Sequence, residues 1–281
     1  MRDFLTDIKI VGVTLASRDA DLLDYAIPNM LKWCDWIMIM MDNESKEVYD
    51  KVREYEEQYR GKKRGEIDRI IVRRSSYHLS LYDEVNNKFS ARWKALRGAV
   101  RDDALAALRR NLEFGNPNYN KIDILLWPDS DEVFTDYLPT LLEEFWKSNY
   151  KGIRFRTVEV VYNMHTIKSW GKAPHMQAMK YTRDLCAFPK KFFCMYSPIS
   201  MDETMVSDNC LVHLAYLTQK HRDFKKDNNW RSFDFNNNRK ELGSALWTLD
   251  KDVTELTPDE IKEVLRRPPD SDFNNYNGIK L

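Results

Sequence analysis

Apolar, β-branched segments alternate with amphipathic ones in the amino-terminal part of the chain, and this alternation limits the possible folds more than any other feature. The segments 8–16, 36–41 and 67–72 have the length and composition of buried strands. Between them, residues 22–33 place apolar side chains at helical spacing, and residues 46–60 form a charged amphipathic segment. Strands that alternate with helices pair in parallel, because each helix carries the chain back across the sheet. The sequence therefore predicts an α/β fold with a doubly wound, mostly parallel sheet.

Length, charge and cysteine content limit the class of protein. The chain has 281 residues, enough for one large domain or two small ones. Lys+Arg and Asp+Glu both number 44, so the net charge of zero gives no general affinity for polyanions. The four cysteines form no CxxC pair, which argues against a zinc cluster or a disulfide scaffold. We find no signal peptide and no membrane-spanning segment in the sequence, and we expect a cytoplasmic protein.

The pattern is less regular after residue 72. Residues 82–114 predict a long helix rich in Lys and Arg, residues 152–161 an alternating strand, and residues 162–212 an irregular segment with three prolines. There is no internal repeat and no low-complexity linker. We therefore expect residues 1–226 to form the main domain and residues 227–281 to form a helical and irregular C-terminal elaboration packed on it.

A cluster of carboxylates follows the apolar segment 122–126, which predicts a buried strand. Pro128 ends this strand because proline has no N–H to donate to a sheet, and Asp129, Asp131 and Glu132 come directly after it. Open α/β sheets bind ligands at the carboxyl ends of their strands, and Mg²⁺ and Mn²⁺ prefer oxygen ligands and leave positions for substrate phosphates. The Asp-x-Asp pattern therefore indicates a metal–diphosphate site. A solvated acidic turn that caps the next helix is the alternative interpretation.

Two other features could belong to the same site. Asp42 follows the second predicted strand, where it would lie at the ligand edge of the sheet or serve as a turn residue or helix N-cap. His213 lies in the strand-like stretch CLVHLAY, as a metal ligand or as a buried core histidine. The basic segment after it supplies Lys220, Arg222 and Lys225, either as phosphate contacts or as solvated surface charges.

These features, taken in order, resemble the GT-A glycosyltransferases, particularly the family 2-like enzymes of bacteria and phages. The matching pieces lie within residues 8–226 and read VGVTLASRDADLLDYAIPNMLKWCDWIMIMMDNES, WPDSDEVF and CLVHLAYLTQKHRDFKK. Most of residues 80–120 and 165–205 lies outside the resemblance. The sequence also departs from the family where the usual Asn-Glu after the first strand is Arg18-Asp19, which bears on the contacts to the donor base.

The resemblance implies a Rossmann-like GT-A domain and a nucleoside-diphosphate sugar as donor, with a UDP-sugar favoured. It implies that Asp42 contacts the nucleoside and that Asp129 approaches the ribose or the metal. It also implies that Asp131 ligates Mn²⁺ or Mg²⁺, with His213 as a further ligand. The metal would neutralise the charge that grows on the leaving nucleoside diphosphate.

An inverting transfer would need a carboxylate base within hydrogen-bond reach of the acceptor hydroxyl. Asp202 and Glu203 are candidates because they precede His213 in a segment expected near the site, and Glu132 is a second choice if it faces the acceptor. Each of these residues could instead be an exposed loop acid. A retaining transfer would require no such base, and the sequence is compatible with both outcomes.

Aromatic and cationic residues are interleaved in the segment 154–185, which suits either a sugar acceptor or a nucleic-acid strand. We expect a glycan or a small molecule as acceptor ahead of DNA, which phage enzymes of this broad type modify on hydroxymethylated bases. The aromatics could equally complete a core. Two rival functions use the same features: a metal-dependent nucleotidyltransferase or other phosphoryl-transfer enzyme, and a non-catalytic nucleotide- or nucleic-acid-binding module of the same fold.

Overall fold

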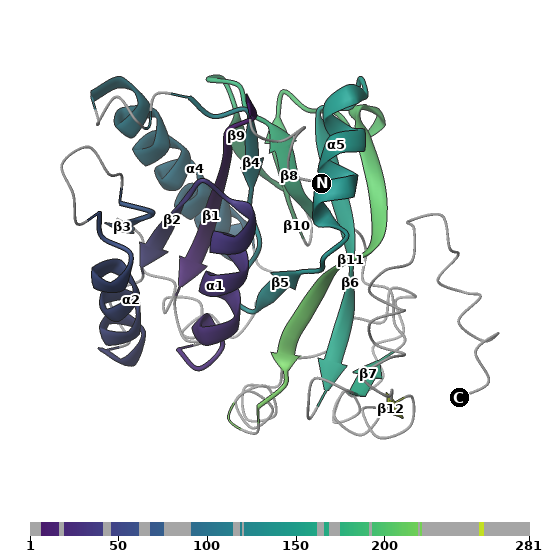
Figure 1. Cartoon of the computed structure of the whole chain (residues 1–281). Helices are drawn as coiled ribbons and strands as arrows, with labels where there is room; N and C mark the ends of the chain where they lie inside the picture. Colours follow the sequence, from purple (N-terminus) through teal and green to yellow (C-terminus); the bar gives the residue numbers. More distant parts are fainter. Residues whose placement is uncertain are drawn as a thin grey trace.

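The computed structural model describes residues 7–16, 20–41, 46–61, 68–75, 91–114, 119, 121–161, 166–168, 175–190, 193–218, 220 and 253–255. These residues form a mixed α/β fold in which helices cover both faces of a large twisted sheet (Figure 1).

The parallel part of the sheet follows the alternation seen in the sequence. Its strand order is β4-β1-β2-β3, and all three pairings are parallel. The strands are β1 (Ile10–Ala16), β2 (Trp36–Met41), β3 (Ile70–Arg74) and β4 (Ile124–Leu126). The helices are α1 (Leu23–Trp33), α2 (Lys46–Gln58), α4 (Ala91–Phe114) and α5 (Leu138–Lys147).

Alternate residues of each strand are buried in two cores on opposite faces of the sheet. In β2, Ile37 and Ile39 belong to the core beneath α1, α2 and α5, whereas Met38 and Met40 belong to the core beneath α4. Figure 1 shows α1 and α2 on one side of the sheet and α4 on the other. Because a strand's side chains point alternately to its two faces, a continuous apolar run fits a strand that is covered on both sides. The predicted doubly wound α/β fold of the Rossmann-like GT-A kind is confirmed.

The remaining strands extend the sheet beyond β4. β8 is antiparallel to both β4 and β6, and the long strand β11 pairs parallel with β6 and antiparallel with β5. A separate hairpin of β9 and β10 packs on α4. The bounds are β5 (Glu132–Phe134), β6 (Gly152–Val161), β7 (Thr166–Lys168), β8 (His175–Lys180), β9 (Cys186–Lys190), β10 (Phe193–Ser197), the 3₁₀ turn η3 (Met201–Glu203), β11 (Thr204–Tyr216) and β12 (Val253–Glu255).

The interpretation of residues 162–212 as irregular was wrong, since β8, β9, β10 and most of β11 lie there. The signal was weak for physical reasons. β8 has the sequence HMQAMK, without a β-branched residue, and the polar residues between Ser207 and Leu211 coincide with a shift in the register of β11 against β6.

The described part of the C-terminal segment 227–281 is the strand β12, which pairs antiparallel with β7 and so adds a strand to the main sheet. The rest of that segment lies outside the described residues, including the expected helical part.

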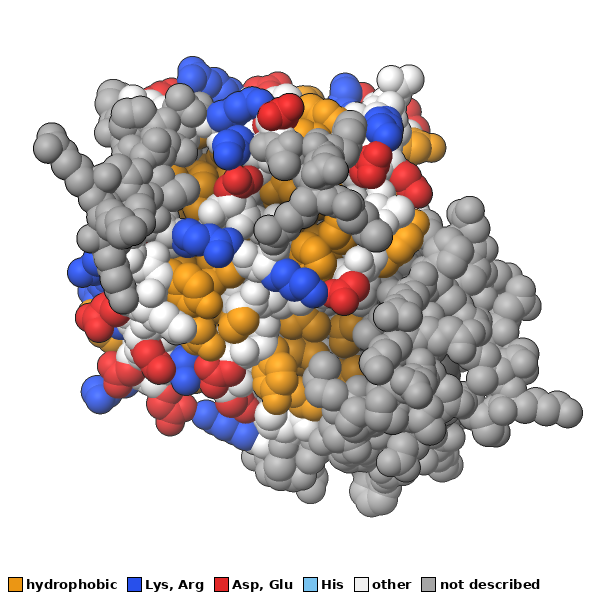
Figure 2. Space-filling model, in the orientation of Figure 1, with side chains coloured by type: hydrophobic (Ala, Val, Ile, Leu, Met, Phe, Trp, Pro, Cys, Tyr) orange, Lys and Arg blue, Asp and Glu red, His pale blue; other side chains and the backbone are white. Residues whose placement is uncertain are grey.

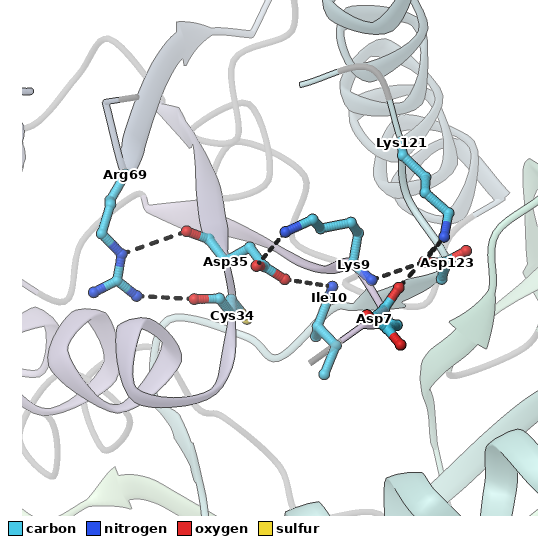
Figure 3. A network of polar contacts seen from close by, with 8 residues as sticks. All are labelled: Asp7, Lys9, Ile10, Cys34, Asp35, Arg69, Lys121 and Asp123. Carbon is cyan, nitrogen blue, oxygen red and sulfur yellow. Dashed lines mark hydrogen bonds and ion pairs between the residues drawn. The ribbon is translucent and has the colours of Figure 1, made fainter. Parts of the chain in front are cut away.

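The amino-terminal edge of the parallel strands is held by a polar network (Figure 3). The carboxylate of Asp35 accepts hydrogen bonds from the backbone N–H of Ile10 at 2.9 Å and from Lys9 Nζ at 3.1 Å. Asp123 accepts one from the backbone N–H of Lys9 at 2.7 Å, and Arg69 donates to the carbonyl of Cys34 at 2.8 Å. These bonds join the starts of β1, β2, β3 and β4, so the opposite, carboxyl edge is the one left for a ligand site.

None of the described helices is both long enough and apolar enough to cross a membrane.

Candidate functional site

The acidic turn lies between β4 and β5, at the carboxyl end of the sheet. β4 has a parallel neighbour, β1, on one side and an antiparallel neighbour, β8, on the other, so the turn lies where the strand direction changes. The turn is closed by two bonds: the backbone N–H of Glu132 donates to the carbonyl of Asp129 at 3.1 Å, and the backbone N–H of Asp129 donates to Glu132 Oε2 at 2.8 Å. The sequence therefore places three carboxylates on a tightly held turn.

Asp131 and His213 are brought into contact by the pairing of β5 with β11. His213 stands opposite Glu132 in that ladder, and the backbone N–H of Leu214 donates to the carbonyl of Asp131 at 2.6 Å. Asp131 Oδ2 then lies 3.1 Å from His213 Nε2, with the two side chains 19% and 10% exposed. Two residues that the sequence singled out independently thus face one another.

Glu132, the second candidate for the base, is buried in the turn. Its Oε2 accepts hydrogen bonds from the backbone N–H of Asp129 and from the side-chain amide of Gln177. Burial raises its pKa to about 7, and the nearby charges of Asp129 and Asp131 add to this while His213 opposes it. These contacts give Glu132 a part in shaping the turn, and its role as a base stays a prediction.

Asp129 is turned toward Arg101 of α4. Its Oδ1 lies 3.1 Å from a terminal nitrogen of Arg101, whose side chain is 6% exposed while that of Asp129 is 34% exposed. In the sequence, Arg101 is one of many basic residues in a predicted helix. Its spacing of three, four and seven residues from Ala104, Leu105 and Leu108 does indicate that it lies on the buried face of that helix.

The residues fit a divalent cation with two protein ligands. Among the described residues, no group of three or more His, Cys, Asp and Glu side chains is arranged to hold a metal. Asp131 and His213 lie 3.1 Å apart, the distance of an ion pair, which is also close enough for both atoms to contact one cation. Mg²⁺ is commonly bound in proteins by one or two carboxylates, with water and substrate phosphates in the other positions. Asp129, the third predicted ligand, has Oδ1 engaged by Arg101.

Only some of the residues predicted to contact the donor lie among the described residues. Lys220 Nζ lies 2.8 Å from Glu47 Oε2 near the start of α2, so the segment after β11 reaches the helix that follows β2. Asp42, Arg222 and Lys225 lie outside the described residues.

Asp202 and Glu203, the predicted base candidates, are not brought together with the acidic turn. Both belong to η3, directly before β11, whereas His213 lies near the other end of that strand. Nine residues of extended chain correspond to about 30 Å, and the register shifts of β11 shorten this only in part. Glu203 instead closes a capping box with Ser200 and forms an ion pair with Lys151.

Replacing Glu203 by glutamine is expected to remove an acid-sensitive contribution to stability. The ion pair with Lys151 and the bonds from Ser200 lower the pKa of Glu203 from 4.5 to about 2. A carboxyl whose folded pKa is depressed stabilises the fold above its unfolded pKa, and this is lost as the pH falls through the folded value. The melting temperature of Glu203→Gln should lie slightly below that of the wild type at pH 6, and the difference should vanish between about pH 4.5 and pH 2. Thermal unfolding across this range measures it, with Asp202→Asn as the exposed control; a constant difference at all pH values would contradict the assignment.

Comparisons with known proteins give little beyond the fold. No family model and no curated protein matches the chain. One solved structure, assigned as a glucose-1-phosphate thymidylyltransferase from Bacillus anthracis and crystallised with sucrose, is 14% identical with a TM-score of 0.31 and covers 54% of this chain. The chain spans only 55% of that protein. A 4-diphosphocytidyl-2C-methyl-D-erythritol synthase from Anaerococcus prevotii is 12% identical with a TM-score of 0.36, and the match covers 80% of this chain and 99% of that one. At such TM-scores neither likeness assigns a function, and the site geometry has to carry the argument.

Proposed function

We propose that this protein is a metal-dependent glycosyltransferase that binds a nucleoside-diphosphate sugar at the carboxyl edge of its sheet and transfers the sugar to a hydroxyl group. The observation that supports this best is the contact between Asp131 and His213, which lies beside the turn at the carboxyl end of β4. The Asp131 carboxylate supplies the oxygen ligand that Mn²⁺ and Mg²⁺ prefer, at the edge where α/β sheets bind ligands, and the His213 imidazole would add a nitrogen ligand beside it.

Asp131 and His213 would hold Mn²⁺ or Mg²⁺, which when bound supplies positive charge to the diphosphate leaving group. The chain's own residues keep these two ligands in place before any substrate arrives. The carbonyl of Asp131 is anchored by Leu214, His213 is fixed by the β5–β11 ladder, and Glu132 closes the turn. Such preorganisation lowers the cost of binding, because few side chains have to be ordered at that moment.

The other donor contacts extend the proposal to residues that the resemblance implies. Asp42 would contact the nucleoside and Asp129 the ribose, whereas Lys220, Arg222 and Lys225 would approach the phosphates. Lys220 pairs with Glu47, and that partner would have to be exchanged for a phosphate. Because Asp202 and Glu203 directly precede β11, at the end far from His213, and Glu132 is buried, we assign no catalytic base.

The connections after β1 and β2 contain no glycine-rich phosphate loop, so the phosphates of a bound nucleotide would have to be held by side chains or by a cation. Backbone amides that cradle a triphosphate usually belong to glycine-rich loops, where the absence of side chains allows close approach. Here no glycine occurs from residue 13 to residue 60, a span that contains the connections after β1 and β2. A diphosphate held by a cation and by Lys or Arg side chains needs no such loop. Nucleotidyl transfer is the alternative function, and the product assay distinguishes it from glycosyl transfer.

We propose a glycan or a small molecule as the acceptor. Among the described residues on the face shown in Figure 2, Lys and Arg side chains are interspersed with Asp and Glu side chains and do not form one basic field. Together with the net charge of zero, this gives no support to DNA as the acceptor.

A thermal-shift panel of UDP-, GDP-, CDP- and dTDP-sugars, each with and without Mn²⁺, tests donor binding. A ligand that binds only the native state at 100 times its Kd adds about 2.7 kcal/mol to the free energy of unfolding, so the true donor should raise the melting temperature by several degrees. The active nucleotide is then assayed for products. Release of the free nucleoside diphosphate supports glycosyl transfer. If the protein instead releases pyrophosphate from a nucleoside triphosphate and a sugar phosphate, its activity is nucleotidyl transfer. No Mn²⁺-dependent shift with any donor would overturn the proposal.

A further inference from the structure

Arg101 is a buried cation that contacts Asp129 in the acidic turn and two aromatic residues next to it. Its Nε donates to the hydroxyl of Tyr196 at 3.2 Å, and a terminal nitrogen lies 3.1 Å from Asp129 Oδ1. The guanidinium carbon lies 5.8 Å from the centre of the Trp127 ring, and that ring packs on Tyr196 at 5.4 Å between centroids. A guanidinium that is fixed on two edges and one face has little freedom to turn.

We propose that Arg101 is a positioning residue for the donor site: through Tyr196 and Asp129 it sets the orientation of the Asp129 carboxylate and couples the β9–β10 hairpin to that site. The inference rests on the proposed function and adds a route by which a distant element controls it. Asp129 is one-third exposed, so a carboxylate held by Oδ1 keeps part of its surface open to a ligand.

The hairpin is docked on the same helix at two further points, which fixes where Tyr196 lies. Asp102, next to Arg101, accepts a hydrogen bond from the backbone N–H of Ala187 in β9 at 2.6 Å. Arg109, two turns further along α4, donates to the carbonyls of Arg183 and Leu185 before the hairpin. A shift of the hairpin on α4 would therefore move the hydroxyl of Tyr196, and Arg101 would carry that shift to Asp129.

Two conservative variants and one matched control test this. Arg101→Lys keeps the charge but loses the planar fork that reaches two partners at once, and Tyr196→Phe removes only the hydroxyl. Arg110→Lys changes the same residue type on the same helix at an exposed position, away from the hairpin anchors and from the acidic turn. Calorimetry with Mn²⁺ and each of UDP, GDP, CDP and dTDP gives the Kd, and thermal unfolding of each variant shows that it is folded.

Supporting residues around a binding site typically contribute roughly 10- to 100-fold to affinity, and we expect Arg101→Lys to weaken binding of the preferred nucleotide by this amount. Tyr196→Phe should weaken binding in the same direction by a smaller factor, and it should add nothing in the Arg101→Lys background because the relay is already broken. Arg110→Lys should bind within twofold of the wild type.

The outcomes separate this inference from the proposed function. If the wild type binds and both Arg101→Lys and Tyr196→Phe bind equally well, the positioning role is wrong and Arg101 is a packing residue, while the proposed function stands. If Arg101→Lys does not fold, Tyr196→Phe alone decides, and unchanged affinity overturns the inference. If the wild type binds none of the four nucleotides with Mn²⁺, the proposed function fails and the inference fails with it.

Discussion

Replacing Asp131 by alanine is expected to abolish most of the Mn²⁺-dependent affinity for the nucleoside-diphosphate donor. The substitution removes the carboxylate that lies 3.1 Å from His213 and leaves one protein ligand for the cation. Loss of an outer partner of a metal ligand commonly costs up to about 100-fold in metal affinity, so loss of the ligand itself should cost at least that much. Calorimetric titration of the preferred nucleotide with and without Mn²⁺ measures it, and sugar transfer should fall in parallel.

Asp136→Ala is the matched control, because Asp136 is a carboxylate on the same segment of chain that is 77% exposed and pairs with Lys32. It should bind the nucleotide like the wild type. If Asp131→Ala kept the Mn²⁺ dependence of the wild type, the metal site would lie elsewhere. If it bound the nucleotide fully without any metal effect, a non-catalytic binding module would explain the protein better.

Replacing Trp127 by alanine is expected to give the largest loss of stability of any substitution near the site. Trp127 is fully buried between β4 and the acidic turn, and it packs on Tyr196 and beneath Arg101. Truncating a buried Trp to Ala costs about 3–5 kcal/mol, from lost transfer free energy and from the cavity left behind. Urea denaturation of the two proteins gives the difference in the free energy of unfolding.

Tyr25→Ala serves as the comparison, because Tyr25 is 45% exposed on α1 and its truncation should stay within about 0.5 kcal/mol. The Trp127 variant should also bind the donor more weakly than Tyr25→Ala under conditions in which both are folded, since Trp127 supports Arg101 and the turn. A stability loss below 1 kcal/mol for Trp127→Ala would contradict the packing described here.

The amino-terminal half of the fold was predictable because its local signals agree with its tertiary environment. Strands such as β2, with the sequence WIMIMM, are buried on both faces, and a continuous apolar run is what such a strand requires. The elements after β6 were harder to predict because their partners are distant in sequence. β8 is antiparallel and carries no β-branched residue, and β11 contains polar residues at its register shift. Their strand conformation is determined by pairing with β4 and β6, which no local pattern reveals.

The residues of the candidate site likewise include some that the sequence indicates and others that only the fold reveals. The juxtaposition of Asp131 and His213 followed from motifs that a sequence displays directly, an Asp-x-Asp after a buried strand and a histidine in an apolar one. Arg101 did not stand out, because in the sequence it is one of many cations on a long helix and only the packing of α4 buries it. The burial of Glu132 and its hydrogen bond from Gln177 could not be predicted, because both depend on β8 and the sequence pattern did not reveal that strand.

Locating Mn²⁺ by anomalous scattering in crystals grown with UDP and MnCl₂ tests the central claim most directly. We expect an anomalous peak within direct coordination distance of Asp131 and His213, with the diphosphate oxygens completing the coordination of the ion. A nucleotide bound at this edge with the metal bound by other residues, or a peak at Asp131 and His213 with no nucleotide near it, would contradict the account.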